Sequence, residues 1–265
     1  MLITSLQNPK IKYAASLRES RQRKKDGVML VEGRDEIAMA LEGNAKPQTL
    51  FYCPEFFGEG NHSSLLKQIT QSGAEILEVN KRAFEKIAYR ENPDGWLAIF
   101  PSIQKKLDDL KLGDNPLIVV VESVEKPGNL GAILRTSDAA NVDAVLICDP
   151  KIDLGNPNVL RTSRGTLFTL PIVLAKSDEA FGWLKAHGIK TVAATPEGST
   201  LYTEANLRQP IAIIVGTEKS GLSALWRDSA DIKARVPMFG KINSLNVSVS
   251  TALFIYEAVR QRGRR

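Results

Sequence analysis

The chain has 265 residues, of which 43% are hydrophobic and 25% charged, so it is long enough for two globular domains. No apolar run approaches the ~20 residues that cross a bilayer, and the first residues lack the charged-then-apolar order of a signal peptide. The sequence therefore argues against a membrane protein and predicts a cytoplasmic one. Because Cys53, Cys148, His62 and His187 have no metal-ligand spacing, we also expect no metal site.

The first hundred residues alternate between helical and strand-like patterns. Helices are predicted near 9–25, 35–41, 63–71 and 81–88, and strands over 50–53, 75–79 and 96–100. This alternation is typical of a small α/β domain. A polar segment rich in lysine and aspartate follows and ends in Gly-Asp-Asn-Pro, as linkers often do. We therefore predict a first domain over residues 1–103, a linker over 104–115 and a second domain over 116–265.

The second domain has the pattern of a parallel sheet. Strands are predicted over 117–121, 144–148, 172–174, 189–194 and 211–215, and helices near 131–140, 178–187, 221–227 and 245–261. The strand at 211–215 is continuously apolar rather than alternating, which indicates burial on both faces of a parallel sheet. In the last helix, Leu245, Ala252, Leu253, Tyr256 and Val259 follow helical spacing and are predicted to face the core.

The positive charge is concentrated at the two ends of the chain. Residues 1–26 hold seven basic side chains against two acidic ones, and the last six residues hold four arginines, although the whole chain carries only +5. The residues between are therefore mildly acidic. Such clustering is typical of segments that contact phosphate, although solvated basic termini give the same pattern. The N-terminal candidates for contact with a nucleic acid are Lys10, Lys12, Arg21, Arg23, Lys24 and Lys25.

Three polar loops each open a predicted helix of the second domain. They cover residues 126–135, 215–222 and 243–248. Taken singly, each has a structural explanation: Gly128 and Gly131 suit a tight turn, Glu218 complements a helix N-terminus, and Ser244 or Asn246 is a helix cap. The first loop lacks both the third glycine of a dinucleotide fingerprint and the lysine of an ATP-binding loop. Because ligands collect at the carboxyl ends of parallel strands, the three loops together predict one composite site.

In order and spacing, these loops resemble the signature motifs of the SpoU–TrmH branch of the SPOUT RNA methyltransferases. The first motif is matched by Asn129, Gly131 and Arg135, the second by Gly216, Glu218, Gly221 and Leu222, and the third by residues 237–248. The resemblance covers about residues 115–262. Residues 1–100 also look like the ribosomal-protein-like RNA-binding domain that many members carry.

The resemblance implies an α/β protein with a small N-terminal RNA-binding domain and a C-terminal parallel-sheet domain tied in a deep trefoil knot. It also implies a homodimer, S-adenosylmethionine as methyl donor and an RNA ribose 2′-hydroxyl as acceptor. The cofactor-binding residues that it implies are Ala194, Thr195, Gly216, Glu218, Met238 and Leu245. The catalytic residues are Asn129, Arg135, Glu218, Ser244 and Asn246.

Chemistry narrows the role of Arg135 within that set. A guanidinium does not readily give up its proton, so Arg135 is expected to orient phosphate and stabilise developing negative charge, with the general base left open. Asn129, Ser244 and Asn246 would hold the ribose or complete a site shared in the dimer, while Glu218 would order the cofactor loop. Arg161 and Arg164 are further RNA-contact candidates, although a solvated helix end fits them equally.

Several functions stay open. The separate basic N-terminal domain favours a structured target such as ribosomal RNA, and a tRNA 2′-O-methyltransferase is the nearest alternative. A non-catalytic RNA-binding or ribosome-assembly protein would bind RNA with a steep salt dependence but without cofactor affinity. An NAD-dependent oxidoreductase is the most distant alternative.

Overall fold

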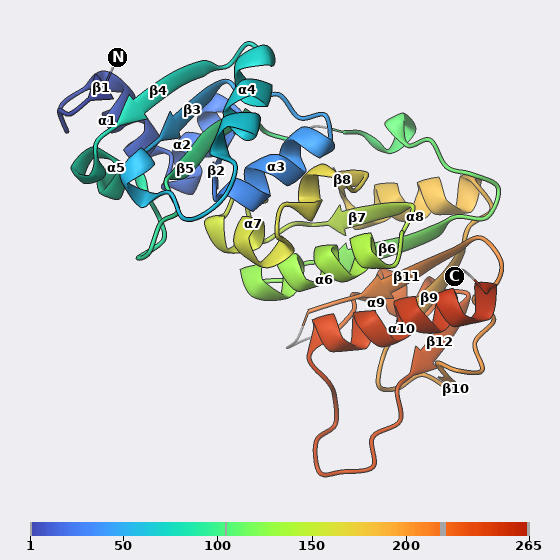
Figure 1. Cartoon of the computed structure of the whole chain (residues 1–265). Helices are drawn as coiled ribbons and strands as arrows, with labels where there is room; N and C mark the ends of the chain where they lie inside the picture. The colour runs from blue at the N-terminus through green and yellow to red at the C-terminus, as the bar shows by residue number, and fades with distance from the viewer. Residues whose placement is uncertain (1, 104, 218–220, 264–265) are drawn as a thin grey trace. The chain divides into compact units, whose positions relative to one another are not determined.

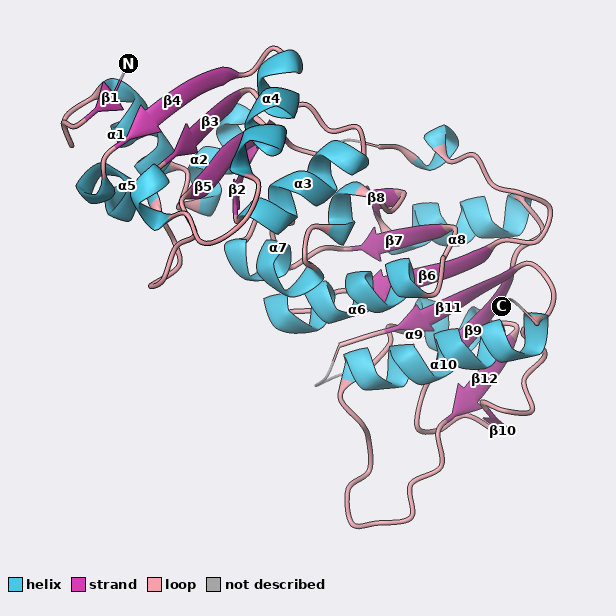
Figure 2. Cartoon of the chain, in the orientation of Figure 1, coloured by secondary structure: helices cyan, strands magenta, loops and turns pink. Residues whose placement is uncertain are grey.

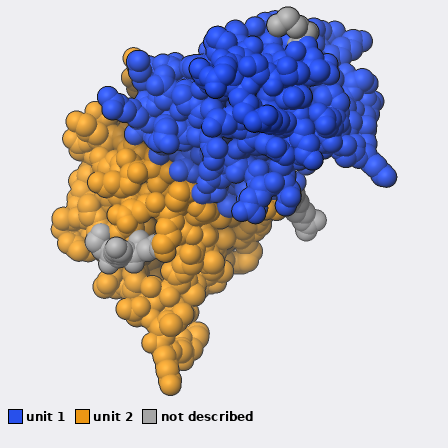
Figure 3. Space-filling model, turned by 90° about the vertical axis from the view of Figure 1, so that its left-hand side faces the viewer, with its two compact units in different colours: residues 1–103, 153–169 blue, residues 104–152, 170–265 orange. Residues whose placement is uncertain are grey.

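The computed structural model describes residues 2–103, 105–217 and 221–263. The chain forms two compact units, which Figure 3 colours separately. Unit 1 consists of residues 1–103 and 153–169, and unit 2 of residues 104–152 and 170–265. The sequence patterns did not predict that residues 153–169 group with the N-terminal residues. The functional boundaries at 103 and 116 stay a prediction.

Unit 1 is a five-stranded mixed sheet with helices around it, as Figures 1 and 2 show. The strand order is β1-β4-β3-β5-β2, with β5 antiparallel to both of its neighbours. The strands are β1 (Leu2–Ile3), β2 (Val28–Glu32), β3 (Thr49–Tyr52), β4 (Glu75–Val79) and β5 (Trp96–Pro101). The α-helices are α1 (Pro9–Ser16), α2 (Ser20–Asp26), α3 (Arg34–Glu42), α4 (His62–Gln71), α5 (Lys81–Ile87) and α7 (Pro157–Ser163), and Pro54–Phe56 and Thr166–Phe168 form 3-10 turns.

The N-terminal basic segment differs from the single helix predicted over 9–25. It forms two short helices separated at residues 17–19, and the first begins where the Asn8 side chain accepts a hydrogen bond from the amide of Lys10 at 2.9 Å. The second ends at Gly27, whose φ of 65° is the left-handed conformation that favours glycine. The strand β2 that follows was not predicted, although it is buried along its whole length.

Unit 2 is a seven-stranded sheet in which every paired neighbour is parallel, which confirms the predicted fold class. The order is β10-β12-β9-β11-β6-β7-β8. The strands are β6 (Leu117–Glu122), β7 (Ala144–Cys148), β8 (Ile172–Ala175), β9 (Lys190–Ala194), β10 (Thr200–Leu201), β11 (Ile211–Val215) and β12 (Ile232–Arg235). The helices are α6 (Pro127–Ala139), α8 (Ser177–Ala186), α9 (Ala224–Ser229) and α10 (Val247–Arg262), with a 3-10 turn at Leu107–Asp109.

The C-terminal helix α10 packs beside α6 and against β11 (Figure 1). Its buried apolar side chains are Val247, Phe254, Ile255 and Ala258. The face predicted to be core is therefore the less buried one: Tyr256 is 50% exposed, and the other four members of that face are only partly buried. The deep knot stays a prediction. None of the helices in the described ranges is long and apolar enough to span a membrane.

Candidate functional site

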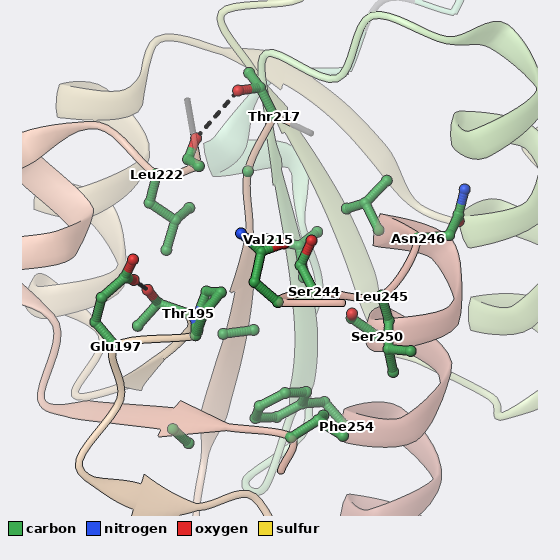
Figure 4. Close-up of a pocket in the computed structure, with 18 of the residues that line it drawn as sticks. Thr195, Glu197, Val215, Thr217, Leu222, Ser244, Leu245, Asn246, Ser250 and Phe254 are labelled. Carbon is green, nitrogen blue, oxygen red and sulfur yellow. Dashed lines mark hydrogen bonds between the residues drawn. The ribbon is translucent and has the colours of Figure 1, made fainter. Parts of the chain in front are cut away.

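A cavity of about 730 Å³ lies at the carboxyl ends of β9, β11 and β12 (Figure 4). These strand ends meet because the three strands are parallel and in register: Ala193 pairs with Ile214 on one side and Lys233 on the other. The loop before α10 and the first turns of that helix form another wall. The lining residues are Ala194–Glu197, Val215–Thr217, Gly221, Leu222, Arg227, Ala234, Val236, Met238, Asn243–Val247, Ser250 and Phe254.

The described ends of the loop after β11 are hydrogen-bonded to each other beside the cavity. The amides of Thr217 and Gly221 each donate to the other's carbonyl oxygen at 3.1 Å. A Cβ at Gly216 would lie 2.5 Å from the carbonyl oxygen of Gly221, so this turn requires glycine at 216. The predicted site residue Glu218 lies outside the described residues.

A buried carboxylate anchors the end of this loop. Glu122, at the end of β6, is almost completely buried and accepts from the Ser223 amide at 2.8 Å and from the Ser177 hydroxyl at 3.1 Å. The Ser177 oxygen in turn accepts from the indole N–H of Trp226 at 3.1 Å. Glu122 thereby ties β6 to the chain immediately after Gly221 and Leu222. Glu122 was not among the predicted site residues, although the sequence shows an acid at the end of a strand of five apolar residues.

Asn246 joins the third predicted motif to the first. Its Oδ1 caps α10 by accepting from the Ser248 amide at 2.9 Å, and its Nδ2 donates to Oδ1 of Asn129 at 3.1 Å. The two asparagines are 117 residues apart, and the packing of α10 on α6 brings them together. The same amide therefore serves as helix cap and as a contact at the cavity rim.

Most predicted cofactor residues lie together. Ala194, Thr195, Gly216, Met238 and Leu245 all line the cavity, as do the predicted catalytic residues Ser244 and Asn246. Asn129 reaches the rim through Asn246.

Arg135 does not share this surface. It is exposed on α6, is absent from the cavity lining and follows Asn129 by six residues, which places the two side chains about 120° apart around the helix. Arg135 is therefore not among the residues that line the cavity of its own chain, and its catalytic role stays a prediction.

Two charged residues of the lining were not predicted. Glu197 follows β9 in the turn Thr195-Pro-Glu-Gly198, and Arg227 lies on α9. The hydroxyl of Thr195 donates to the Glu197 carboxylate, and this bond holds the pKa of Glu197 below its usual value, with the charge of Arg227 as a smaller cause. Neither residue belongs to the three motifs, and only the position of the turn after a buried strand could have indicated Glu197.

The RNA-contact candidates divide into exposed and buried residues. Lys12, Arg21, Lys24, Lys25 and Arg161 are exposed. Lys10 is also exposed, although it pairs with Glu75 at 2.6 Å, and Arg164 pairs with Asp35 at 3.6 Å.

Arg23 is a correction to the predicted set. Its side chain is 3% exposed, pairs with Asp153 at 2.6 Å and donates from Nη1 to the carbonyl oxygens of Leu17 and Arg18 at 2.7 and 2.8 Å. The guanidinium is therefore committed to holding the bend between α1 and α2 and cannot contact RNA in this conformation. Among the described residues, no group of three or more His, Cys, Asp or Glu could hold a metal ion.

Comparisons with known proteins identify the family of the chain. The SpoU rRNA Methylase family profile matches residues 116–256, and the MRM3-like substrate binding domain profile matches residues 8–98. The chain is 28% identical to the 23S rRNA (guanosine(2553)-2′-O)-methyltransferase RlmP of Bacillus subtilis, over 96% of this chain and 97% of that protein. It is 30% identical to an uncharacterized tRNA/rRNA methyltransferase of Synechocystis, over 98% of this chain and 94% of the relative.

Solved structures show the same fold over nearly the whole chain. An AdoMet-bound rRNA methyltransferase from Sinorhizobium meliloti superposes with a TM-score of 0.89 at 29% identity, covering 98% of this chain and 97% of that one. The SpoU methyltransferase AviRb from Streptomyces viridochromogenes, in complex with AdoMet, superposes with a TM-score of 0.87 at 26% identity, covering 97% and 100%. The chain therefore belongs to the SpoU rRNA methylase family and carries a substrate-binding domain of the MRM3-like type before its methylase region.

Proposed function

We propose that this protein is an S-adenosylmethionine-dependent RNA methyltransferase that transfers a methyl group to a ribose 2′-hydroxyl. The observation that carries the proposal is the cavity closed by Ser244, Leu245 and Asn246, with Asn129 hydrogen-bonded at its rim. Relatives over nearly the full length are named 23S rRNA 2′-O-methyltransferases, and solved relatives hold AdoMet.

The cavity fits this cofactor in size and chemistry. Its volume of about 730 Å³ lies within the ~300–1,000 Å³ of small-molecule sites, and its walls combine apolar side chains such as Leu222 and Phe254 with polar groups such as Ser244 and Ser250. When bound, S-adenosylmethionine supplies a methyl group already activated by its sulfonium. The protein must therefore position the acceptor hydroxyl and deal with its proton.

Side chains at the rim provide that positioning. Asn129 and Asn246, held against each other, together with Ser244, would hold the acceptor ribose beside the cavity. Arg135 keeps its proton and would stabilise the negative charge that develops on the hydroxyl oxygen. Glu218 would order the cofactor loop.

A homodimer accounts for the place of Arg135. Val249 and Tyr256, seven residues apart on α10, are 48% and 50% exposed, and the loop before α10 exposes Phe239 at 96% and Ile242 at 64%. An apolar helix face beside an apolar loop favours burial against a second copy. A partner could then bring its own Arg135 to the cavity rim, where the Arg135 of the same chain is not among the lining residues.

A subunit-mixing experiment tests this shared site. Arg135→Ala and Asn246→Ala should each lose activity, and a re-equilibrated 1:1 mixture should recover about a quarter of wild-type activity, because half of the dimers are mixed and each has one intact site. Recovery requires that Arg135 of one copy acts with Asn246 of the other. Absence of recovery from a mixture shown to exchange subunits would contradict the shared site.

The exposed basic residues of unit 1 suit an RNA substrate, and the relatives named 23S rRNA methyltransferases favour ribosomal RNA, with activity in the cytoplasm. The test is to supply methyl-labelled S-adenosylmethionine and unmodified, size-separated RNA to the full chain, with Asn129→Ala as the control. Label in large ribosomal RNA that the control lacks is the expected result. Label in tRNA would replace the substrate, and RNA binding without transfer or cofactor affinity would favour a non-catalytic protein.

A further inference from the structure

The turn after β9 presents an acidic side chain to the cavity. Glu197 and Arg227 are the ionisable side chains among the described residues that line the cavity. Glu197 lies outside the three family motifs, is itself exposed, and has no ion pair with a described cation within 4 Å. Its carboxylate is therefore not committed to an ion pair among the described residues.

The backbone that carries Glu197 is fixed at both ends of the turn. The amide of Thr195 donates to Ala234 of β12 at 3.0 Å, and the amide of Gly198 closes the turn onto Thr195 at 3.1 Å. Arg235 donates from Nη1 to the carbonyl of Gly198 at 2.5 Å, and a Cβ at Gly198 would lie 2.6 Å from the Ala234 carbonyl carbon. A carboxylate mounted on such a turn is in place before a ligand arrives, which lowers the cost of binding.

Glu197 lies away from the reacting end of the site. In Figure 4, Thr195 and Glu197 are on the opposite side of the cavity from Asn246, beside which Asn129 lies. The strand order agrees: β9 is separated from β6, which precedes Asn129, by β11, so their carboxyl ends are about 10 Å apart. The sulfonium must lie near the acceptor ribose at Asn129 and Asn246, so it is not the group that Glu197 contacts.

The nucleoside end of the cofactor fits this position. Apolar side chains suited to a flat base, Leu222 and Val236, belong to the walls after β11 and β12, the two neighbours of β9. A ribose attached to that base presents two adjacent hydroxyl donors. A carboxylate can accept from both, as the acidic residue of dinucleotide-binding folds does from ribose. A glutamate carboxylate is ionised at neutral pH and can accept both bonds, and the hydrogen bond from Thr195, which lowers the pKa of Glu197, acts in the same direction.

We propose that Glu197 is a cofactor-binding residue that accepts hydrogen bonds from the ribose 2′- and 3′-hydroxyls of S-adenosylmethionine. This inference rests on the proposed function, since it assumes that the cavity holds that cofactor. Thr195 is then a positioning residue, because its hydroxyl donates a hydrogen bond to the Glu197 carboxylate. The pair would set the affinity for the nucleoside end without touching the transferred methyl group.

Calorimetric titration of the full chain with two ligands tests the assignment. S-adenosylhomocysteine keeps both hydroxyls, and its 2′-deoxy analogue lacks one of the two proposed donors. The wild-type chain should bind the first about tenfold more tightly, a difference of ~1.4 kcal/mol. Glu197→Ala should weaken S-adenosylhomocysteine binding about tenfold and bind the two ligands equally, since the acceptor of the missing bond is gone. Glu204→Gln, an exposed acid outside the cavity lining, is the control and should match wild type.

The outcomes separate the two proposals. If the wild-type chain binds neither ligand, the proposed function is overturned, and this inference with it. If it binds both but Glu197→Ala keeps the tenfold preference, Glu197 does not read the ribose, whatever the change in overall affinity. Equal melting temperatures of the variant and wild type would show that the loss of preference is not a loss of fold.

Discussion

Replacement of Arg23 by alanine should destabilise unit 1 strongly. The side chain is 3% exposed and donates two hydrogen bonds to Asp153, at 2.6 and 3.0 Å, and two to backbone carbonyl oxygens. Removing one partner of a buried ion pair typically costs ~3–5 kcal/mol. Asp153 is 16% exposed and keeps the Ser20 hydroxyl as a donor. We therefore expect a loss of stability at the lower end of this range, about 3 kcal/mol.

Thermal and urea unfolding measure this loss. For a domain of roughly 100 residues, about 3 kcal/mol lowers the melting temperature by ~10 °C or more. Lys24→Ala is the matched control, because Lys24 is exposed on the same helix and should change stability by no more than ~0.5 kcal/mol. Lys24→Ala should instead weaken RNA binding and reduce the slope of log affinity against log salt concentration by about one. An Arg23→Ala variant with wild-type stability but reduced RNA affinity would refute this reasoning and restore Arg23 as an RNA contact.

Three further changes follow from other contacts. Glu122→Ala should weaken S-adenosylmethionine binding about tenfold, because the amide of Ser223 loses its acceptor. Glu122→Gln keeps one side-chain oxygen and should retain most of the affinity. Equal Kd values for wild type and Glu122→Ala would contradict this. Burial raises the pKa of Asp231, but hydrogen bonds from the amide and hydroxyl of Thr191 and from a neighbouring lysine outweigh it and leave the pKa lowered. The ionised carboxylate therefore contributes stability that is present above pH 3.8 and is lost as the pH falls through the folded pKa. Asp231→Asn should make the free energy of unfolding less dependent on pH in this acidic range. An unchanged pH dependence in the variant would argue against this role. Tyr256→Glu should halve the mass measured by light scattering, since it places a charge on the exposed face of α10, and an intact dimer would exclude that face.

Buried parallel strands were the most predictable part of the fold. The runs at 144–148 and 211–215 were predicted with their observed ends, because β-branched and apolar residues buried on both faces leave little ambiguity. The strand Ile232–Arg235 was missed because it alternates apolar and basic residues and has no such run. The membership of residues 153–169 in unit 1 depends on tertiary packing, which local patterning does not encode.

The last helix shows a different limit. Its sequence is apolar on two sides, and periodicity alone cannot say which side the core takes. The core takes Phe254, Ile255 and Ala258, while Tyr256 is left half-exposed. Both apolar sides of the helix carry the same periodic signal, so the less buried face was chosen from the sequence.

Within the site, the positions of the motif residues at the ends of strands could be predicted from the sequence. The roles of single side chains that lie between the motifs could not. Thr195, Gly216 and Leu245 line the cavity because their loops follow adjacent strands or, for Leu245, precede α10. Glu197 gave no comparable signal, since an acid in a turn is usually only solvated. Arg23 was predicted to contact RNA but is buried, because a run of basic residues gives no indication of which side chain turns inward.

The most direct test of the proposed function is the chemical identity of the methylated product. RNA labelled by the full chain with methyl-labelled S-adenosylmethionine would be digested to nucleosides and analysed by mass spectrometry, and a parallel sample would be hydrolysed in alkali. We predict label in a 2′-O-methyl nucleoside and in an alkali-resistant dinucleotide, because a methylated 2′-oxygen cannot attack the neighbouring phosphate. Label confined to a base, with every phosphodiester bond still cleaved by alkali, would contradict ribose 2′-O-methylation.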